Sequence, residues 1–222
     1  MAKIAIAIDG PAGAGKSTIA KTISRKLGII YLDTGAMYRT VALKAISQGI
    51  GTKDRQKLSS MVETIDIRVV CSGDGQRIYL DGIDVSEMIR TPEISIGASN
   101  VATIPEVRLK MVELQRQIAG ENSVVMDGRD IGTYVLPNAG YKFFLNASVE
   151  ERAKRRYLEQ KEKGNTSISL DDVLRDIEYR DKNDSSRDFA PLKKAEDAIE
   201  LDTTDLTIQQ VADRIMSYIE QE

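Results

Sequence analysis

Short apolar runs alternate with segments of helical periodicity along the first fifty residues. Residues 4–8 (IAIAI) form an apolar run with the length of one buried strand. A glycine-rich loop and an amphipathic segment closed by Gly28 follow, and a second apolar run occupies residues 29–32. Residues 37–48 then show helical spacing again. This strand–helix–strand–helix order predicts a parallel sheet with right-handed crossovers.

The pattern changes between residues 65 and 88. After a helix predicted over residues 53–65, short apolar runs are separated by turn sequences such as Asp81-Gly82. Strands at this spacing are typical of hairpins. We therefore expect a small antiparallel insert in an otherwise α/β chain.

The rest of the chain returns to the first pattern. The predicted elements are strands at 123–126, 141–145 and 198–201 and helices at 92–103, 105–119, 149–161, 170–183 and 207–220. Prolines at the first turn support two of these helices, and a capping box supports the one that begins near Leu170. The sequence thus predicts one α/β domain with a small insert.

Composition limits the possible chemistry. The 222 residues include no histidine, which excludes Ser-His-Asp catalysis and His-ligated zinc and leaves carboxylates, lysines and arginines. The single cysteine, Cys71, cannot form an intrachain disulfide, which fits a reducing cytoplasm. The first strand follows the N-terminus directly, so we expect no signal peptide. The net charge of −3 and the absence of a long apolar run argue against nucleic-acid and membrane partners.

A phosphate-binding loop lies between the first strand and the first helix. Gly10, Gly15, Lys16 and Ser17 fit the pattern G-x-x-x-x-G-K-[ST]. Loop N–H groups and the helix N-terminus would bind phosphate oxygens, Lys16 would reach the β- and γ-phosphates, and Ser17 would bind Mg²⁺. A plain glycine turn is the alternative, but the flanking strand and helix favour a nucleoside triphosphate site. The predicted ATP-binding residues here are Gly10, Pro11, Ala12, Gly13, Ala14, Gly15, Lys16, Ser17 and Thr18.

Arginine and aspartate cluster in three further segments, at or near the ends of predicted elements. These are residues 33–39 (DTGAMYR), 127–130 (DGRD) and 180–187 (RDKNDSSR). Residues that follow the carboxyl ends of strands line the ligand crevice of an open α/β sheet. Each cluster alone could be a solvated ion pair of little consequence. Together they offer guanidinium groups for a second phosphate and carboxylates for sugar hydroxyls or base amines.

The helix predicted over residues 149–161 is rich in charge. It carries Arg152, Arg155 and Arg156 and precedes Gly164-Asn165. One interpretation is a solvated helix stabilised by i,i+4 pairs. The other is a mobile lid that places arginines on the transferred phosphate.

Taken together, these segments resemble bacterial cytidylate kinases. The matching stretches are residues 8–17 (IDGPAGAGKS), 32–39 (LDTGAMYR), 126–133 (MDGRDIGT) and the spaced residues of 180–187. The resemblance covers essentially the whole chain, insert included. It implies a five-stranded parallel sheet flanked by helices, a monophosphate-binding insert and an Arg-rich lid. The single domain would then consist of a core (1–36, 104–150 and 166–222), an insert (37–103) and a lid (151–165).

The resemblance also implies an activity: Mg²⁺-dependent transfer of the γ-phosphoryl group of ATP to CMP or dCMP. Lys16, Arg129 and Arg187 are the expected catalytic residues, and Arg155 and Arg156 are expected to bind ATP. Arg39, Arg129 and Arg187 would hold the CMP phosphate. Thr34, Tyr38, Arg180 and Asp184 would line the ribose side. Ser99, Arg108 and Asp130 would read cytosine. Because the acceptor is already an oxyanion, this chemistry needs no histidine base.

Other functions stay open at this point. A uridylate or adenylate kinase is the nearest alternative. A regulatory GTPase would share the phosphate loop but would normally carry an Asn-Lys-x-Asp motif, which the sequence lacks. A nucleic-acid-binding module fits poorly with the acidic balance and few aromatic residues. We expect a cytoplasmic monomer whose partners are small nucleotides.

Overall fold

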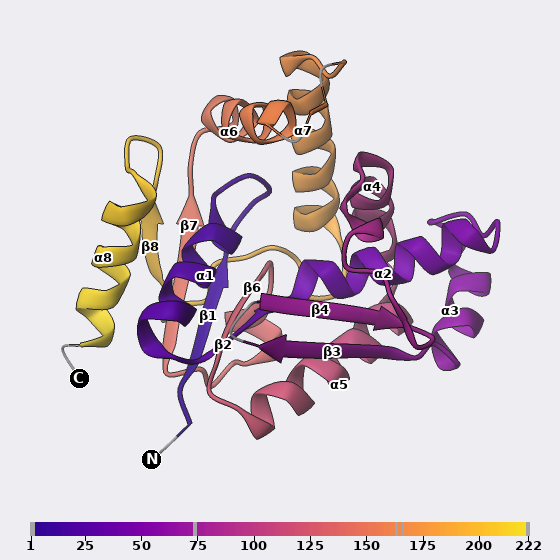
Figure 1. Ribbon diagram of the computed structural model, residues 1–222, viewed down its shortest axis with the longest axis horizontal. Coiled ribbons are helices and arrows are strands. Elements are labelled where there is room, and N and C mark those ends of the chain that lie inside the picture. Colours follow the sequence, from indigo (N-terminus) through magenta and orange to yellow (C-terminus); the bar gives the residue numbers. More distant parts are fainter. Residues whose placement is uncertain (1–2, 73–74, 163, 166, 221–222) are drawn as a thin grey trace.

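The computed structural model describes residues 3–72, 75–162, 164–165 and 167–220. A five-stranded sheet lies at its centre, in the order β2-β6-β1-β7-β8, and all its strand pairs are parallel (Figure 1). Its strands are β1 (Ala5–Asp9), β2 (Ile30–Asp33), β6 (Val124–Gly128), β7 (Tyr141–Asn146) and β8 (Ile199–Asp202). The α/β fold with a parallel sheet is therefore confirmed.

Helices cover both faces of this sheet because successive residues of a strand point to opposite sides. Ile6 and Ile8 of β1 pack with the helices of one face, and Ala7 packs with the helices of the other. The first face is covered by α1 (Lys16–Leu27) and α8 (Ile208–Ile219). The second is covered by α2 (Thr34–Ser47) and α5 (Pro105–Glu121). The first layer thus places α1, the helix that follows the phosphate loop, directly on the sheet.

A three-stranded antiparallel sheet lies beside the edge strand β2. It consists of β3 (Ile67–Ser72), β4 (Gly75–Leu80) and β5 (Ile83–Asp84), which follow α3 (Arg55–Glu63). Ile67, Ile78 and Leu80 are buried toward the main core. The predicted insert is thus confirmed, although the tip of its first turn, residues 73–74, lies outside the described residues.

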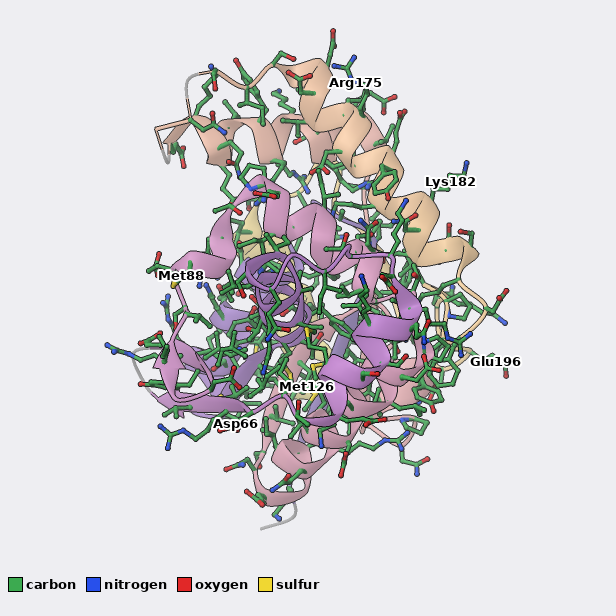
Figure 2. All side chains as sticks on the ribbon, turned by 90° about the vertical axis from the view of Figure 1, so that its right-hand side faces the viewer. Asp66, Met88, Met126, Arg175, Lys182 and Glu196 are labelled. Atoms are coloured by element: carbon green, nitrogen blue, oxygen red, sulfur yellow. The ribbon has the colours of Figure 1, made fainter. Side chains whose placement is uncertain are left out.

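The remaining helices stand above the carboxyl ends of the parallel strands (Figure 1). They are α4 (Pro92–Val101), α6 (Val149–Glu162) and α7 (Leu170–Ser186). Figure 2 shows Arg175 and Lys182 on the outer side of α7, pointing away from the molecule, whereas Arg180 and Asp184 of the same helix line an internal cavity. No helix in the described part of the chain is long and apolar enough to span a bilayer.

Several element boundaries differ from the prediction for local reasons. Helix α2 begins at Thr34 instead of residue 37, because the Asp33 carboxylate accepts a hydrogen bond from the Ala36 N–H and caps the helix. Helix α7 continues to Ser186 instead of residue 183. A 3₁₀ turn at Met88–Arg90 and a π-helical turn at Ile131–Val135 were not predicted.

The π-helical turn forms because a carboxylate holds its first amides. Both oxygens of buried Asp9, at the end of β1, accept hydrogen bonds from the N–H groups of Ile131 and Gly132, at 2.8 Å each. Burial raises the pKa of Asp9 to about 6, although the two N–H groups oppose this shift. The turn is thereby fixed directly after Asp130.

Candidate active site

A cavity of about 1000 Å³ opens at the carboxyl ends of the parallel strands. This is the position that parallel α/β sheets use for ligands. Every predicted site residue lines it except Gly10, Pro11 and Ala12, which form the base of the phosphate loop. The structure therefore brings together residues that lie up to 174 positions apart, from Gly13 to Arg187.

The phosphate loop needs glycine where its backbone approaches its neighbours. Gly10 has a φ of +148°, and a Cβ there would lie 2.0 Å from the carbonyl oxygen of Leu145. Gly13 has a φ of +77°, and its Cβ would lie 3.0 Å from the backbone oxygen of Arg152. No other residue type fits these positions without moving the backbone.

Lys16 is buried inside this loop. Its ammonium group donates to the Pro11 carbonyl oxygen at 2.6 Å, so the side chain folds back over the loop. Burial, and then the nearby Arg129, lower the pKa of Lys16 well below its usual value, while Asp127 and Asp184 act in the opposite direction. The Lys16 amino group is thus desolvated, and the negative charge of a bound phosphate would stabilise its protonated form.

Asp127 faces Ser17 and was not among the predicted binding residues. It lies near the end of β6, and its carboxylate accepts hydrogen bonds from the Ser17 hydroxyl (2.7 Å) and the Tyr31 hydroxyl (2.8 Å). Burial and then Asp33 raise the pKa of this carboxyl group. The signal available in the sequence was an acidic residue at the end of an apolar strand. Hydroxyl and carboxylate oxygens together suit a hard divalent cation.

The described residues contain no group of three or more His, Cys, Asp or Glu side chains that could hold a metal by themselves. A cation at Ser17 and Asp127 would therefore need phosphate and water oxygens to complete its coordination. Mg²⁺ commonly binds nucleotide-dependent enzymes in this way. The donor set thus fits a metal that arrives with a nucleotide.

On the neighbouring strand, Asp33 is the register partner of Asp127 and holds Arg39, which also lines the cavity. Its Nη2 donates to the Asp33 carboxylate at 2.7 Å. Its Nε is buried and has no hydrogen-bond partner among the described residues. Burial alone would raise the pKa of Asp33, but Arg39 and the Ala36 N–H outweigh it and lower that pKa. Arg39 is therefore oriented and still has a donor for an anion.

Three further arginines surround a single carboxylate on α7. Asp184 accepts from Arg129 Nε at 2.7 Å and lies 3.6 Å from Arg187 Nη1. Burial and then the positive charge of Arg129 lower the pKa of Arg180 to about 10. Against its own burial, the arginines hold the pKa of Asp184 below its usual value. The excess of guanidinium groups makes this region suitable for an anionic ligand.

The residues predicted to read cytosine form one wall of the cavity. Asp130 accepts from Arg108 and, at 3.4 Å, from Arg187 Nη2. Arg108 also donates to the Ala102 carbonyl and lies over the Tyr38 ring, 5.5 Å from its centroid. Ser99 accepts from the Asn183 amide at 3.3 Å. Burial raises the pKa of Tyr38 to about 12, so this ring stays neutral.

The arginines of α6 separate into two groups. Arg155 and Arg156 line the cavity, and Arg155 donates to the carbonyls of Thr203 (2.6 Å) and Thr204 (3.1 Å). Arg152 is buried and points to the phosphate loop instead, where it donates to the Ala12 carbonyl at 2.9 Å and pairs with Asp181. Arg152 thus stabilises the phosphate loop from α6.

The loop after β8 also lines the cavity, and sequence analysis did not select it. Residues 203–208 close the cavity beside the phosphate loop. Its position after the carboxyl end of a predicted strand was the only signal. Arg155 is bonded to the first two residues of this loop, so the loop and Arg155 form one part of the cavity wall.

Replacement of Arg152 tests its structural role. Arg152→Met should lower the free energy of unfolding by roughly 3 kcal/mol, because the buried Ala12 and Ala147 carbonyls and the Asp181 carboxylate lose their partner. The KM for ATP should rise as the loop loosens. Lys154→Met is the control, since Lys154 is an exposed residue of the same helix. Denaturant unfolding measures the stability of each variant, and steady-state kinetics measures its KM for ATP. Equal stabilities of the two variants would contradict the structural role of Arg152.

The fold and the site define a P-loop kinase: one cavity is lined by a phosphate loop with lysine and serine and by a group of arginines. The family model for cytidylate kinase matches residues 6–221. The cytidylate kinase of Bacillus subtilis is 51% identical over 99% of this chain and 97% of the relative. The cytidylate kinase of Desulfitobacterium hafniense is 54% identical over 96% of this chain and 90% of the relative. The chain belongs to the cytidylate kinase family.

Solved structures support the fold at much lower identity. A shikimate kinase from Bacteroides thetaiotaomicron has a TM-score of 0.51 with 15% identity, over 99% of both chains. An uncharacterised protein from Eubacterium ventriosum has a TM-score of 0.54 with 14% identity, over 99% of this chain and 100% of that chain. Both share the architecture.

Proposed function

We propose that this chain transfers the γ-phosphoryl group of ATP to CMP or dCMP, giving ADP and CDP or dCDP. One observation carries the proposal: a single cavity is lined both by the phosphate loop with Lys16 and by a group of arginines that includes Arg129, whose charge acts on Lys16. The relatives named cytidylate kinase, about half identical over nearly the whole chain, support the choice of acceptor.

In this proposal the phosphate loop and Lys16 bind the ATP phosphates. Lys16 leaves the Pro11 carbonyl for the β- and γ-phosphates, whose charge keeps it protonated. Ser17 and Asp127 would hold Mg²⁺, which would supply neutralisation of phosphate charge. The loop at 203–208 encloses the donor base, and Arg155 and Arg156 approach the phosphates from α6.

The acceptor phosphate binds to Arg39, Arg129 and Arg187. One of its oxygens attacks the γ-phosphorus while the bond to the bridging oxygen of ADP breaks. No base is required because the attacking oxygen is already ionised. Catalysis consists of in-line alignment and neutralisation of charge in a site that excludes water. The arginines therefore act as both binding and catalytic residues.

The division of the chain into a core, an insert and a lid is also part of this proposal. The insert at 37–103 supplies acceptor residues such as Arg39 and Ser99, and the lid at 151–165 supplies Arg155 and Arg156. We also infer that the chain acts as a monomer. We infer a cytoplasmic enzyme, since ATP and CMP are available there and a lone thiol stays reduced.

A coupled assay tests the proposal directly. ATP-Mg is supplied with CMP, dCMP, UMP or AMP in parallel. CMP and dCMP should be turned over efficiently and AMP hardly at all. Comparable turnover of UMP or AMP, or ATP hydrolysis without any monophosphate, would contradict it.

The ribose role of Asp184 has its own test. Asp184→Ala should raise the KM for CMP by about tenfold or more and leave the KM for ATP nearly unchanged, because a hydrogen bond to a charged group is lost on the acceptor side alone. Asp184→Asn preserves the side-chain volume if the alanine variant folds poorly. Lys182→Ala, on the outer face of α7, is the matched control. Equal damage to both nucleotides, or to neither, would reject the role.

A further inference from the structure

The antiparallel sheet has no direct part in the cavity. None of the described residues of β3, β4 or β5 lines it, although these strands lie beside β2, whose carboxyl end does. Strand β2 is an edge strand, since it pairs with β6 alone. The contacts between the sheet and this edge are therefore a route by which the sheet can affect the site, beside the packing of β4 against α2.

Two side chains of the β3–β4 hairpin contact backbone groups of β2 that a neighbouring strand would otherwise pair with. Gln76 of β4 accepts from the Asp33 N–H at 2.6 Å and donates to the Asp33 carbonyl at 3.3 Å. Cys71, its cross-strand partner, lies with its thiol 3.5 Å from the Tyr31 carbonyl. Gln76 thus holds both backbone groups of one residue at the end of the strand.

That residue organises the acceptor side of the cavity. The Asp33 side chain caps α2 through the Ala36 N–H (2.9 Å) and holds Arg39 Nη2 (2.7 Å). The Arg39 Nε remains buried and without a partner among the described residues. A chain of hydrogen bonds therefore leads from Gln76 to an arginine that lines the cavity.

We propose that Gln76 is a positioning residue for the acceptor phosphate, acting through Asp33 on the guanidinium of Arg39. This inference rests on the proposed function. Backbone displacement of Asp33 would move both its capping contact and the arginine it orients. The antiparallel sheet then serves to hold the end of β2, and with it the phosphate-binding arginine, without touching the nucleotide.

Gln76→Met tests the inference, since methionine has a similar length and cannot form either hydrogen bond. The KM for CMP should rise three- to tenfold, the range expected for the loss of one or two neutral hydrogen bonds. The KM for ATP and the kcat should stay nearly unchanged. Cytidine, which lacks the phosphate, should inhibit the variant and the unmodified chain with the same inhibition constant.

Two controls separate positioning from general loosening of the hairpin. Ser86→Ala removes the hydroxyl that accepts from the Ile78 N–H at 3.0 Å, so it loosens the sheet without touching β2. Arg77→Met changes an exposed side chain next to Gln76 on the other face of β4. Both should leave the KM for CMP unchanged. A rise in Ser86→Ala equal to that in Gln76→Met would overturn the proposal.

A double-mutant cycle identifies the residue through which Gln76 acts. In an Arg39→Met background, Gln76→Met should have little further effect on the KM for CMP. Full additivity would overturn the proposal. If Gln76→Met folds poorly, Gln76→Glu, which keeps the acceptor and loses the donor, replaces it in each comparison with the same expected direction.

The same assays distinguish this inference from the function on which it rests. If the unmodified chain does not phosphorylate CMP, both fail. If it does, and the Gln76 variants keep the normal KM for CMP, the positioning role alone is wrong.

Discussion

Lys16→Met should reduce kcat by about 10²–10³-fold or more and leave the fold intact. The lysine is the buried cation of the phosphate loop, and it would stabilise the charge that develops on the phosphate oxygens in the transition state. Removing this cation therefore costs transition-state stabilisation beyond any loss of ATP affinity. Steady-state kinetics at saturating ATP and CMP measure the effect.

The same substitution should leave the stability of the nucleotide-free protein unchanged or raise it. Burial already lowers the pKa of Lys16 well below its usual value, which means that folding acts against the charged form. The methionine variant without nucleotide should then have a thermal midpoint equal to or above that of the unmodified chain. Lys26→Met, an exposed residue of the same helix, is the control and should keep normal turnover. Near-normal kcat in folded Lys16→Met would reject the phosphate-loop assignment.

The sequence predicts the local parts of this site because they depend on local rules. A strand, a glycine loop and a helix that follow one another must place the loop at the carboxyl end of the strand, whatever the rest of the fold does. Asp33, Asp127 and Asp130 follow the same rule at the ends of β2 and β6. The strand order β2-β6-β1-β7-β8, however, depends on long-range pairing for which the local pattern gives no information.

The contacts between distant segments were not predictable for the same reason. Arg152 and Arg155 belong to one helix, yet Arg152 supports the phosphate loop and Arg155 faces the cavity. Which face of α6 meets the loop depends on the packing of α6 against α7 and residues 10–13, not on helical periodicity. Gln76 gives no signal at all in the sequence, because its partner is the backbone of a residue 43 positions away.

Base choice is the property that should separate this chain from other nucleoside monophosphate kinases, and Asp130 is the residue expected to set it. Cytosine presents an amino donor where uracil presents a carbonyl acceptor, and the two bases also differ at N3. A carboxylate can only accept, so with UMP it would face another acceptor. An unpaired polar contact of this kind costs on the order of 1–3 kcal/mol. CMP should therefore be preferred over UMP by at least about tenfold in kcat/KM.

The structure adds an alternative role that the experiment must exclude. Asp130 is buried between Arg108 and Arg187, so its carboxylate could serve only to hold these arginines. Asp130→Ala removes the acceptor and leaves Arg108 without its buried partner, and both changes should lower activity with CMP. Asp130→Asn keeps the volume and one acceptor oxygen while adding a donor, which suits the uracil carbonyl.

The ratio of kcat/KM for CMP to that for UMP separates the two roles, because general damage affects both substrates alike. If Asp130 reads the base, the ratio should shrink in Asp130→Ala and shrink further in Asp130→Asn, where the amide can donate to uracil. If Asp130 only pairs with Arg108 and Arg187, both substrates should lose activity together. An unchanged ratio in both variants, with thermal midpoints that show folded protein, would therefore assign Asp130 to the arginine pair alone.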